Sequence, residues 1–193
     1  MTPDNRPLSP ILLSCIHDDA AHRCTAALTI VSSEGTAYMR EEVQHMPVIP
    51  IRPGIYRIHA HIIGPSSLVT ATEHAVEHGA PVITDRMNPM PIEQEWAIAP
   101  VEPLPGAPYY VHLAMHEAAG LVVHSDRLWV NGVPRGEWAK FTFEGVIGGV
   151  KIISDKGLAW RAGYRGAQIQ LTQPKPEFQE TFTLEFVRPA EEE

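Results

Sequence analysis

Four metal-binding side chains lie in a nearly symmetric order near the start of the sequence: Cys15, His17, His22 and Cys24. If residues 18–21 form a hairpin turn, Cys15 would lie opposite Cys24, and His17 opposite His22. Side chains two apart on a strand share a face, so all four would project from one side. Thiolate and imidazole are the ligands that zinc prefers. The pattern also suits a cross-strand disulfide or a buried hairpin whose thiols belong to the core, and the sequence leaves the three interpretations open.

The central histidines form a second candidate metal-binding group. Seven of the ten histidines lie between His59 and His124. His59 and His61 share one strand face, as the His-x-His pairs of cupin metal sites do, but no Glu follows at that motif's spacing. Arg57 shares this face, which favours a wetted surface. Exposed histidines would change charge between about pH 5 and pH 7.

The tryptophans supply a candidate binding surface. Trp129 is expected on one strand face with Arg127 and Asn131. Asn131-Gly132 is the dipeptide best suited to a tight hairpin turn, and such a turn would bring Trp138 close to Trp129. Paired aromatic rings on a sheet suit carbohydrate stacking or a protein hot spot. They suit the interior of a second sheet's core equally well, so the set Arg127, Trp129, Asn131 and Trp138 carries both interpretations.

Catalytic motifs are missing from the sequence. It has no Gly-x-Ser-x-Gly elbow, no phosphate-cradling glycine loop and no Cys beside a recognisable local base. We therefore expect a protein that is not an enzyme. We also expect no organic cofactor, and zinc is the metal that the Cys and His pattern suits.

Alternating apolar and polar residues predict strands along most of the chain. Turn signals rich in Gly, Pro, Asn and Asp separate these runs, a spacing typical of antiparallel sandwiches or barrels. The clearest runs cover residues 25–30, 55–62, 140–144, 168–172 and 181–186. The sequence therefore predicts an all-β fold of antiparallel β-sandwich type, and no internal repeat is evident.

A proline-rich segment at residues 100–108 is the best candidate for a domain boundary, because prolines in close succession favour an extended connector. We expect two small sandwich domains in tandem, at residues 8–99 and 109–189. One large sandwich, with this segment crossing between its sheets, is the alternative.

Composition and charge narrow the range of partners. The chain has 193 residues and a formal charge of −8, and its Lys and Arg residues are not clustered. Direct nucleic-acid binding depends on clustered cations and is not expected. The sequence shows neither a signal-peptide pattern nor an apolar run long enough to cross a membrane. We therefore expect a cytoplasmic protein, or a virion part, which would have the same features.

Residues 23–101 resemble the small β-sandwich domains of competence nuclease inhibitors. The resemblance rests on an apolar strand ending at residues 32–35, the segment 46–57 with its Pro-Gly-x-Tyr-Arg step, and the segment 93–100. It implies a small acidic protein that binds and blocks a partner, and it assigns no functional residue.

The expected function is non-catalytic binding of another protein, as an inhibitor, an immunity-like protein or an assembly component. A structural part of a virion or secretion machine is the alternative within the binding class, and such a part would form homo-oligomers. A metal-binding protein that uses Cys15, His17, His22 and Cys24 or the central histidines is the alternative from another class.

Overall fold

The computed structural model describes residues 30–31, 37–38, 47–62, 67–72, 79–87 and 91–190. The chain forms two compact units, Met1–Gln44 and His45–Glu193. In the first unit, β1 (Ile30–Val31) pairs with β2 (Ala37–Tyr38) in an antiparallel ladder. The predicted metal set lies outside the described residues, so it stays a prediction: Cys15, His17, His22 and Cys24.

The second unit contains one antiparallel sheet of 12 strands. In chain order they are β3 (Gly54–Ala60), β4 (Ser67–Ala71), β5 (Ala80–Asp85), β6 (Trp96–Pro100), β7 (Tyr109–Leu113), β8 (Gly120–His124), β9 (Arg127–Asn131), β10 (Lys140–Val146), β11 (Gly149–Ser154), β12 (Ala159–Arg161), β13 (Gln170–Thr172) and β14 (Phe182–Arg188). Short 3₁₀ helices precede β6, β10 and β14: η1 (Pro91–Gln94), η2 (Arg135–Glu137) and η3 (Phe178–Glu180). Among the described residues, no helical segment has the length and apolarity needed to cross a bilayer.

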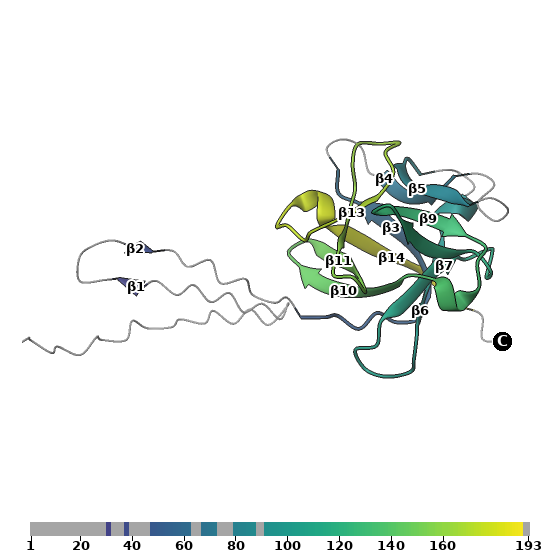
Figure 1. Ribbon diagram of the computed structural model, residues 1–193, viewed down its shortest axis with the longest axis horizontal. Helices are drawn as coiled ribbons and strands as arrows, with labels where there is room; N and C mark the ends of the chain where they lie inside the picture. The colour runs from purple at the N-terminus through teal and green to yellow at the C-terminus, as the bar shows by residue number, and fades with distance from the viewer. Residues whose placement is uncertain are drawn as a thin grey trace, which may run out of the picture. The chain divides into compact units, whose positions relative to one another are not determined.

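The strand pairings divide this sheet into three repeats of four strands: β3–β6, β7–β10 and β11–β14. In each repeat the first strand pairs with the fourth, and the second and third form a hairpin. The repeats join through the pairs β6–β7, β10–β11 and β14–β3, so the first and fourth strands close into a ring. The hairpins pair through β5–β9 and β9–β13, and Figure 1 shows β4, β5 and β9 together in the upper part of this unit. This arrangement is a β-trefoil.

The closed sheet contradicts the predicted β-sandwich. The pairing path runs β10-β11-β12-β13-β9-β5-β4-β3-β6-β7 and returns to β10, so the main sheet is a closed barrel rather than two stacked layers. The small sandwich implied for residues 23–101 by the family resemblance is therefore not the fold of β3–β6. Alternating strands are common to sandwiches and barrels, because both bury one face of each strand, and this shared pattern explains the wrong prediction.

The predicted pair of domains is also wrong, because residues 45–193 form one compact unit. The segment 100–108, expected to connect domains 8–99 and 109–189, instead closes a hairpin. Strand β6 pairs directly with β7 on either side of it, from Trp96 opposite Leu113 to Pro100 opposite Tyr109. The ring closes only when strands from all three repeats are present, so the barrel cannot divide at this loop.

One buried aromatic ring from each repeat occupies the same register position in the core. These are Trp96, Phe141 and Phe182, each 0 % exposed. Each lies directly opposite a buried residue on the paired strand: Tyr56, Tyr109 and Val150 respectively. Trp160 contacts two of the three rings, with centroids 5.2 Å from Phe141 and 5.9 Å from Phe182. Removing these large rings from water is a main source of the barrel's stability.

The predicted strands are confirmed where the structure describes them, but one predicted turn is wrong. The alternation at residues 55–62 corresponds to β3, which buries every second residue towards its end. Strands β8 and β9 are joined by Ser125-Asp126, with φ of 49° and 56°. Two positive φ values in a two-residue loop are the hairpin geometry expected of Asn131-Gly132, yet Asn131 ends β9 instead.

Gly120, at the start of β8, has no room for a side chain. A Cβ atom there would lie 2.1 Å from Cδ2 of Trp138. The indole is held in place because its Nε1–H donates to the Val133 carbonyl at 2.8 Å. Tyr110 also contacts the ring edge-on, with centroids 5.8 Å apart. Trp138 therefore cannot move aside without losing these contacts.

Replacement of Gly120 by Ala should lower the free energy of unfolding by about 1–3 kcal/mol, the usual cost of overpacking a core. Denaturant unfolding measures this directly. Gly136→Ala is the matched control, since a Cβ there meets nothing within 4 Å, and it should change stability by less than about 0.5 kcal/mol. Equal effects of the two substitutions would show that the contact between Gly120 and Trp138 is wrong.

His112 packs against the same indole, with ring centroids 5.4 Å apart. Its Nδ1–H donates to the Leu113 carbonyl at 3.0 Å. Burial lowers the pKa of His112 below its ordinary value of 6.5; the hydrogen bond to Leu113 opposes this shift, Arg135 adds to it and Glu117 opposes it. The folded protein therefore holds this imidazole neutral at pH 7.

Stability should consequently fall as the pH drops below 6.5, because the unfolded chain then binds a proton at His112 that the folded chain resists. Thermal unfolding between about pH 7.5 and about pH 4.5 should show this dependence, and His112→Gln should reduce it. The exposed His116 provides the control, and His116→Gln should keep the wild-type profile. A His112→Gln profile identical to wild type would contradict the assignment.

Candidate ligand-binding site

The β8–β9 hairpin presents two different faces. Leu121, Leu128 and Val130 are each 0 % exposed and belong to the core. Trp129 and Asn131 alternate with the core residues of β9 and are half-buried on the opposite face. Packing in the core therefore holds the β8–β9 hairpin in place, and the outer face of the hairpin is available to bind a ligand.

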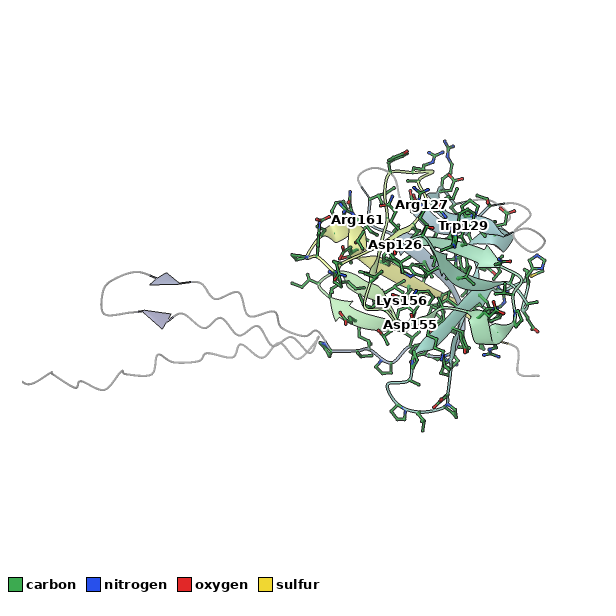
Figure 2. The ribbon with its side chains drawn as sticks, viewed as in Figure 1. Asp126, Arg127, Trp129, Asp155, Lys156 and Arg161 are labelled. Carbon is green, nitrogen blue, oxygen red and sulfur yellow. The ribbon has the colours of Figure 1, made fainter. Side chains whose placement is uncertain are left out.

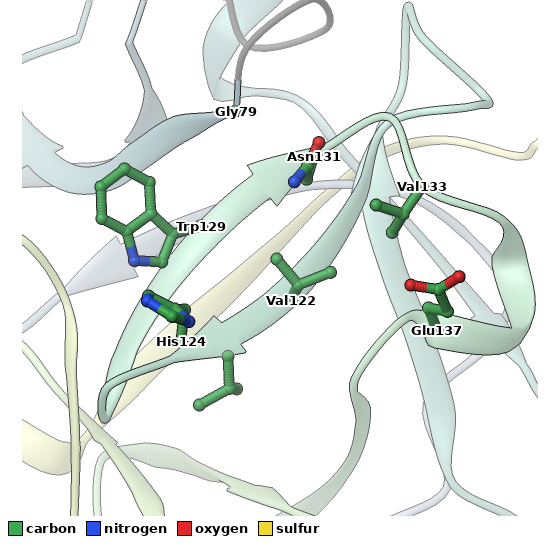
Figure 3. Close-up of a pocket in the computed structure, with 8 residues that line it drawn as sticks. Gly79, Val122, His124, Trp129, Asn131, Val133 and Glu137 are labelled. Atoms are coloured by element: carbon green, nitrogen blue, oxygen red, sulfur yellow. The ribbon is translucent and has the colours of Figure 1, made fainter.

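This outer face borders a groove of ≈ 390 Å³, which we call the Trp129 groove. Figure 3 shows Trp129 and His124 on one side of it and Val133 and Glu137 on the other. Its lining comes from the hairpin, from the chain around η2 and from the neighbouring first repeat: Gly79, Val122, Val123, His124, Trp129, Asn131, Val133 and Glu137.

The groove combines an aromatic ring with several polar groups. The Trp129 indole supplies an apolar face, Asn131 an amide that donates and accepts, and Glu137 a carboxylate that accepts. Nε1 of Trp129 is buried and has no hydrogen-bond partner among the described residues. In Figure 3 this nitrogen lies on the side of the indole towards His124. A ligand with an apolar face and many hydroxyl groups would match this lining.

The aromatic ring is particular to the second repeat. Trp129 lies on β9, the third strand of its repeat. The third strands of the other two repeats, β5 and β13, contain no aromatic residue and so offer no flat stacking surface. The three repeats thus share a core but differ on the outer face of their third strands.

The structure brings together only part of the predicted binding set. Trp129 and Asn131 both line the groove, whereas Arg127 lies at the exposed start of β9, beside Asp126 in the turn (Figure 2). Trp138 is 6 % exposed and packs on Gly120 instead of standing beside Trp129. The prediction failed for Trp138 because Asn131-Gly132 is not the hairpin turn.

Two of the groove residues that were not predicted, His124 and Glu137, carry ionisable side chains. His124 pairs with Arg127 across the hairpin turn, and correct placement of that turn at Ser125-Asp126 would have found it. Glu137 belongs to η2, outside the hairpin, so no strand periodicity could relate it to Trp129.

The predicted His59 and His61 pair faces neighbouring side chains on β14. His59 Nε2 lies 2.7 Å from Glu185 Oε2, and His61 Nε2 lies 2.8 Å from Thr183 Oγ1. In the part of the chain that the structure describes, no three His, Cys, Asp or Glu side chains are grouped to hold a metal ion. His59 and His61 thus act as polar contacts between β3 and β14.

Comparison with known proteins bears on the fold. No protein-family model matches the sequence, and no curated protein matches it. Among solved structures, the designed 3-fold symmetric protein ThreeFoil is 18 % identical over 68 % of this chain and 97 % of its own, with a TM-score of 0.56. SeviL, solved bound to the asialo-GM1 saccharide, is 13 % identical over 70 % of this chain and 98 % of its own, with a TM-score of 0.51.

A third solved structure is the Polyporus squamosus lectin, bound to the epitope Neu5Aca2-6Galb1-4GlcNAc. It is 18 % identical to this chain, with a TM-score of 0.55, and the match covers 69 % of this chain and 49 % of the lectin. The chain therefore spans about half the length of that lectin. At these identities the similarity establishes the fold alone, and the chain shares its closed barrel with these proteins.

Proposed function

We propose that this chain is a non-catalytic saccharide-binding protein and that the Trp129 groove holds the sugar. The observation that carries the proposal is the half-buried Trp129 ring at the edge of a groove that also contains Asn131, His124 and Glu137. A pyranose ring has an apolar C–H face and an edge of hydroxyl groups. The indole matches the first, and the polar side chains match the second.

The carboxylates argue for binding rather than hydrolysis. Glycosidases of the usual kind place two carboxyl groups about 5–9.5 Å apart around the scissile bond. Among the described lining residues of the Trp129 groove, Glu137 alone carries a carboxyl group. It can accept hydrogen bonds from hydroxyl groups, but it has no second carboxyl group with which to share acid and base roles.

The shared fold supports the proposal, since SeviL and the Polyporus squamosus lectin were both solved bound to saccharides. A protein partner was the first expectation from the sequence, but the described residues present no feature that favours a protein over a sugar in this groove. A saccharide partner therefore replaces the inhibitor and assembly roles as the proposed function.

Replacement of Trp129 by Ala should weaken saccharide binding at least about tenfold, which corresponds to about 1.4 kcal/mol. A panel of immobilised galactosides, glucosides, mannosides and N-acetylhexosaminides would identify the sugar, and calorimetry would then compare the variants. Trp129→Phe keeps an aromatic face and should retain part of the affinity.

Tyr164→Ala is the matched control, because Tyr164 is an aromatic residue that is 81 % exposed and does not line the groove. It should bind sugar as the wild type does. Thermal unfolding of each variant checks that the barrel is intact. Unchanged affinity in a folded Trp129→Ala protein, or binding of no member of the panel by the wild type, would refute the proposed function.

A further inference from the structure

A second groove adjoins the Trp129 groove. Its volume is ≈ 630 Å³, and its walls come from β6, the loop after β7, residues 133–135 and the end of β14. Val133 lines both grooves. The short helix η2 begins at Arg135, in the second groove, and ends at Glu137, in the first. A ligand with several linked sugar units can therefore extend past Val133 from one groove into the other.

Arg135 is held in the second groove by aromatic rings instead of a carboxylate. Its guanidinium carbon lies 5.0 Å from the ring centroid of Tyr110 and 5.8 Å from that of Trp138. Among the described residues it forms no ion pair. Stacking on the flat faces orients a guanidinium while its N–H donors, which lie at the edge, stay available to an anion.

The charges that line the second groove favour an anion. They are Arg135, Arg188 and Glu117, a formal sum of +1 in a chain whose formal charge is −8. Arg188 contacts Glu95 at 2.7 Å, and Glu95 also contacts Arg57 at 3.2 Å. Arg57 in turn contacts Glu185 at 3.6 Å, so Arg188 belongs to a network of two guanidinium groups and two carboxylates. Of the two arginines that line this groove, Arg135 is therefore the one that no described carboxylate neutralises.

We propose that the natural ligand is an acidic oligosaccharide, with a sugar ring on Trp129 and an anionic substituent, carboxylate or sulfate, on Arg135. This inference rests on the proposed function of the Trp129 groove. Fork-shaped guanidinium donors match the paired oxygens of either anion. Glu137 faces the first groove, so the charged substituent is accommodated in the second.

Matched pairs of saccharides test the inference: lactose against sialyllactose, lactose against sulfated lactose, and methyl-esterified against free trigalacturonate. The wild-type protein should bind the acidic member of at least one pair about tenfold more tightly, in low salt where screening is weak. The carboxylate and sulfate pairs then identify which anion is preferred.

Arg135→Gln should abolish this preference, so that acidic and neutral members bind with similar affinity, whereas Arg135→Lys should keep part of the preference because the charge remains. Arg52→Gln is the control, since the Arg52 guanidinium lies 5.2 Å from the Phe186 ring centroid and does not line either groove. It should keep the wild-type preference. Thermal unfolding shows whether each variant is folded.

The outcomes separate the two proposals. The acidic-ligand inference is wrong if acidic and neutral members bind equally, or if the preference survives in folded Arg135→Gln. Either result leaves the proposed saccharide site in the Trp129 groove unaffected. If the protein binds acidic saccharides in a way that requires Arg135 but not Trp129, the ligand does not span the two grooves. The proposed function of the Trp129 groove is then wrong as well. Binding of no saccharide overturns both.

Discussion

Closure of the six-stranded ring is the constraint on which the rest of the second unit depends. Every first and fourth strand of a repeat pairs with two others of the ring, so no ring strand is left as an open edge. Closure also brings Trp96, Phe141 and Phe182 to equivalent core positions. The side chains on the inner faces of all three repeats must pack together in this shared core. Those on the outer faces of the hairpins do not have to, so functional differences between the repeats can arise there.

The candidate site follows from this division. Leu128 and Val130 hold β9 on the core, and Trp129 between them points outwards. Trp129 is therefore presented by a strand rather than a loop. The packing of Trp138 under Gly120 positions the neighbouring chain around η2. That chain supplies Glu137 to one groove and Arg135 to the other. In the proposed function, Trp129 contacts the sugar, and Trp138 positions the segment that lies between the two grooves.

Local sequence patterns predicted the strands but not the way they associate. The alternation in β3 and β10 follows directly from burial of one strand face. Closure depends on pairs such as β14 with β3, far apart in the chain, and alternation carries no information about partners. The threefold repeat is not evident in the sequence, because equivalent core positions in the three repeats hold large apolar residues of different types. In the site, periodicity correctly placed Trp129 and Asn131 on one face, and it misplaced Trp138 because the turn lies at Ser125-Asp126.

The indole N–H signals of the four tryptophans provide the most direct test of the central claim, that Trp129 contacts the sugar. They can be assigned with single Trp→Phe variants and followed by ¹H–¹⁵N NMR during titration with the methyl glycosides of common hexoses and N-acetylhexosamines. We predict that the Trp129 signal shifts with a saturable dependence on the sugar, while the buried Trp96 and Trp160 keep their positions. A titration in which the Trp129 signal stays fixed, or in which only the Trp138 signal moves, would contradict this account.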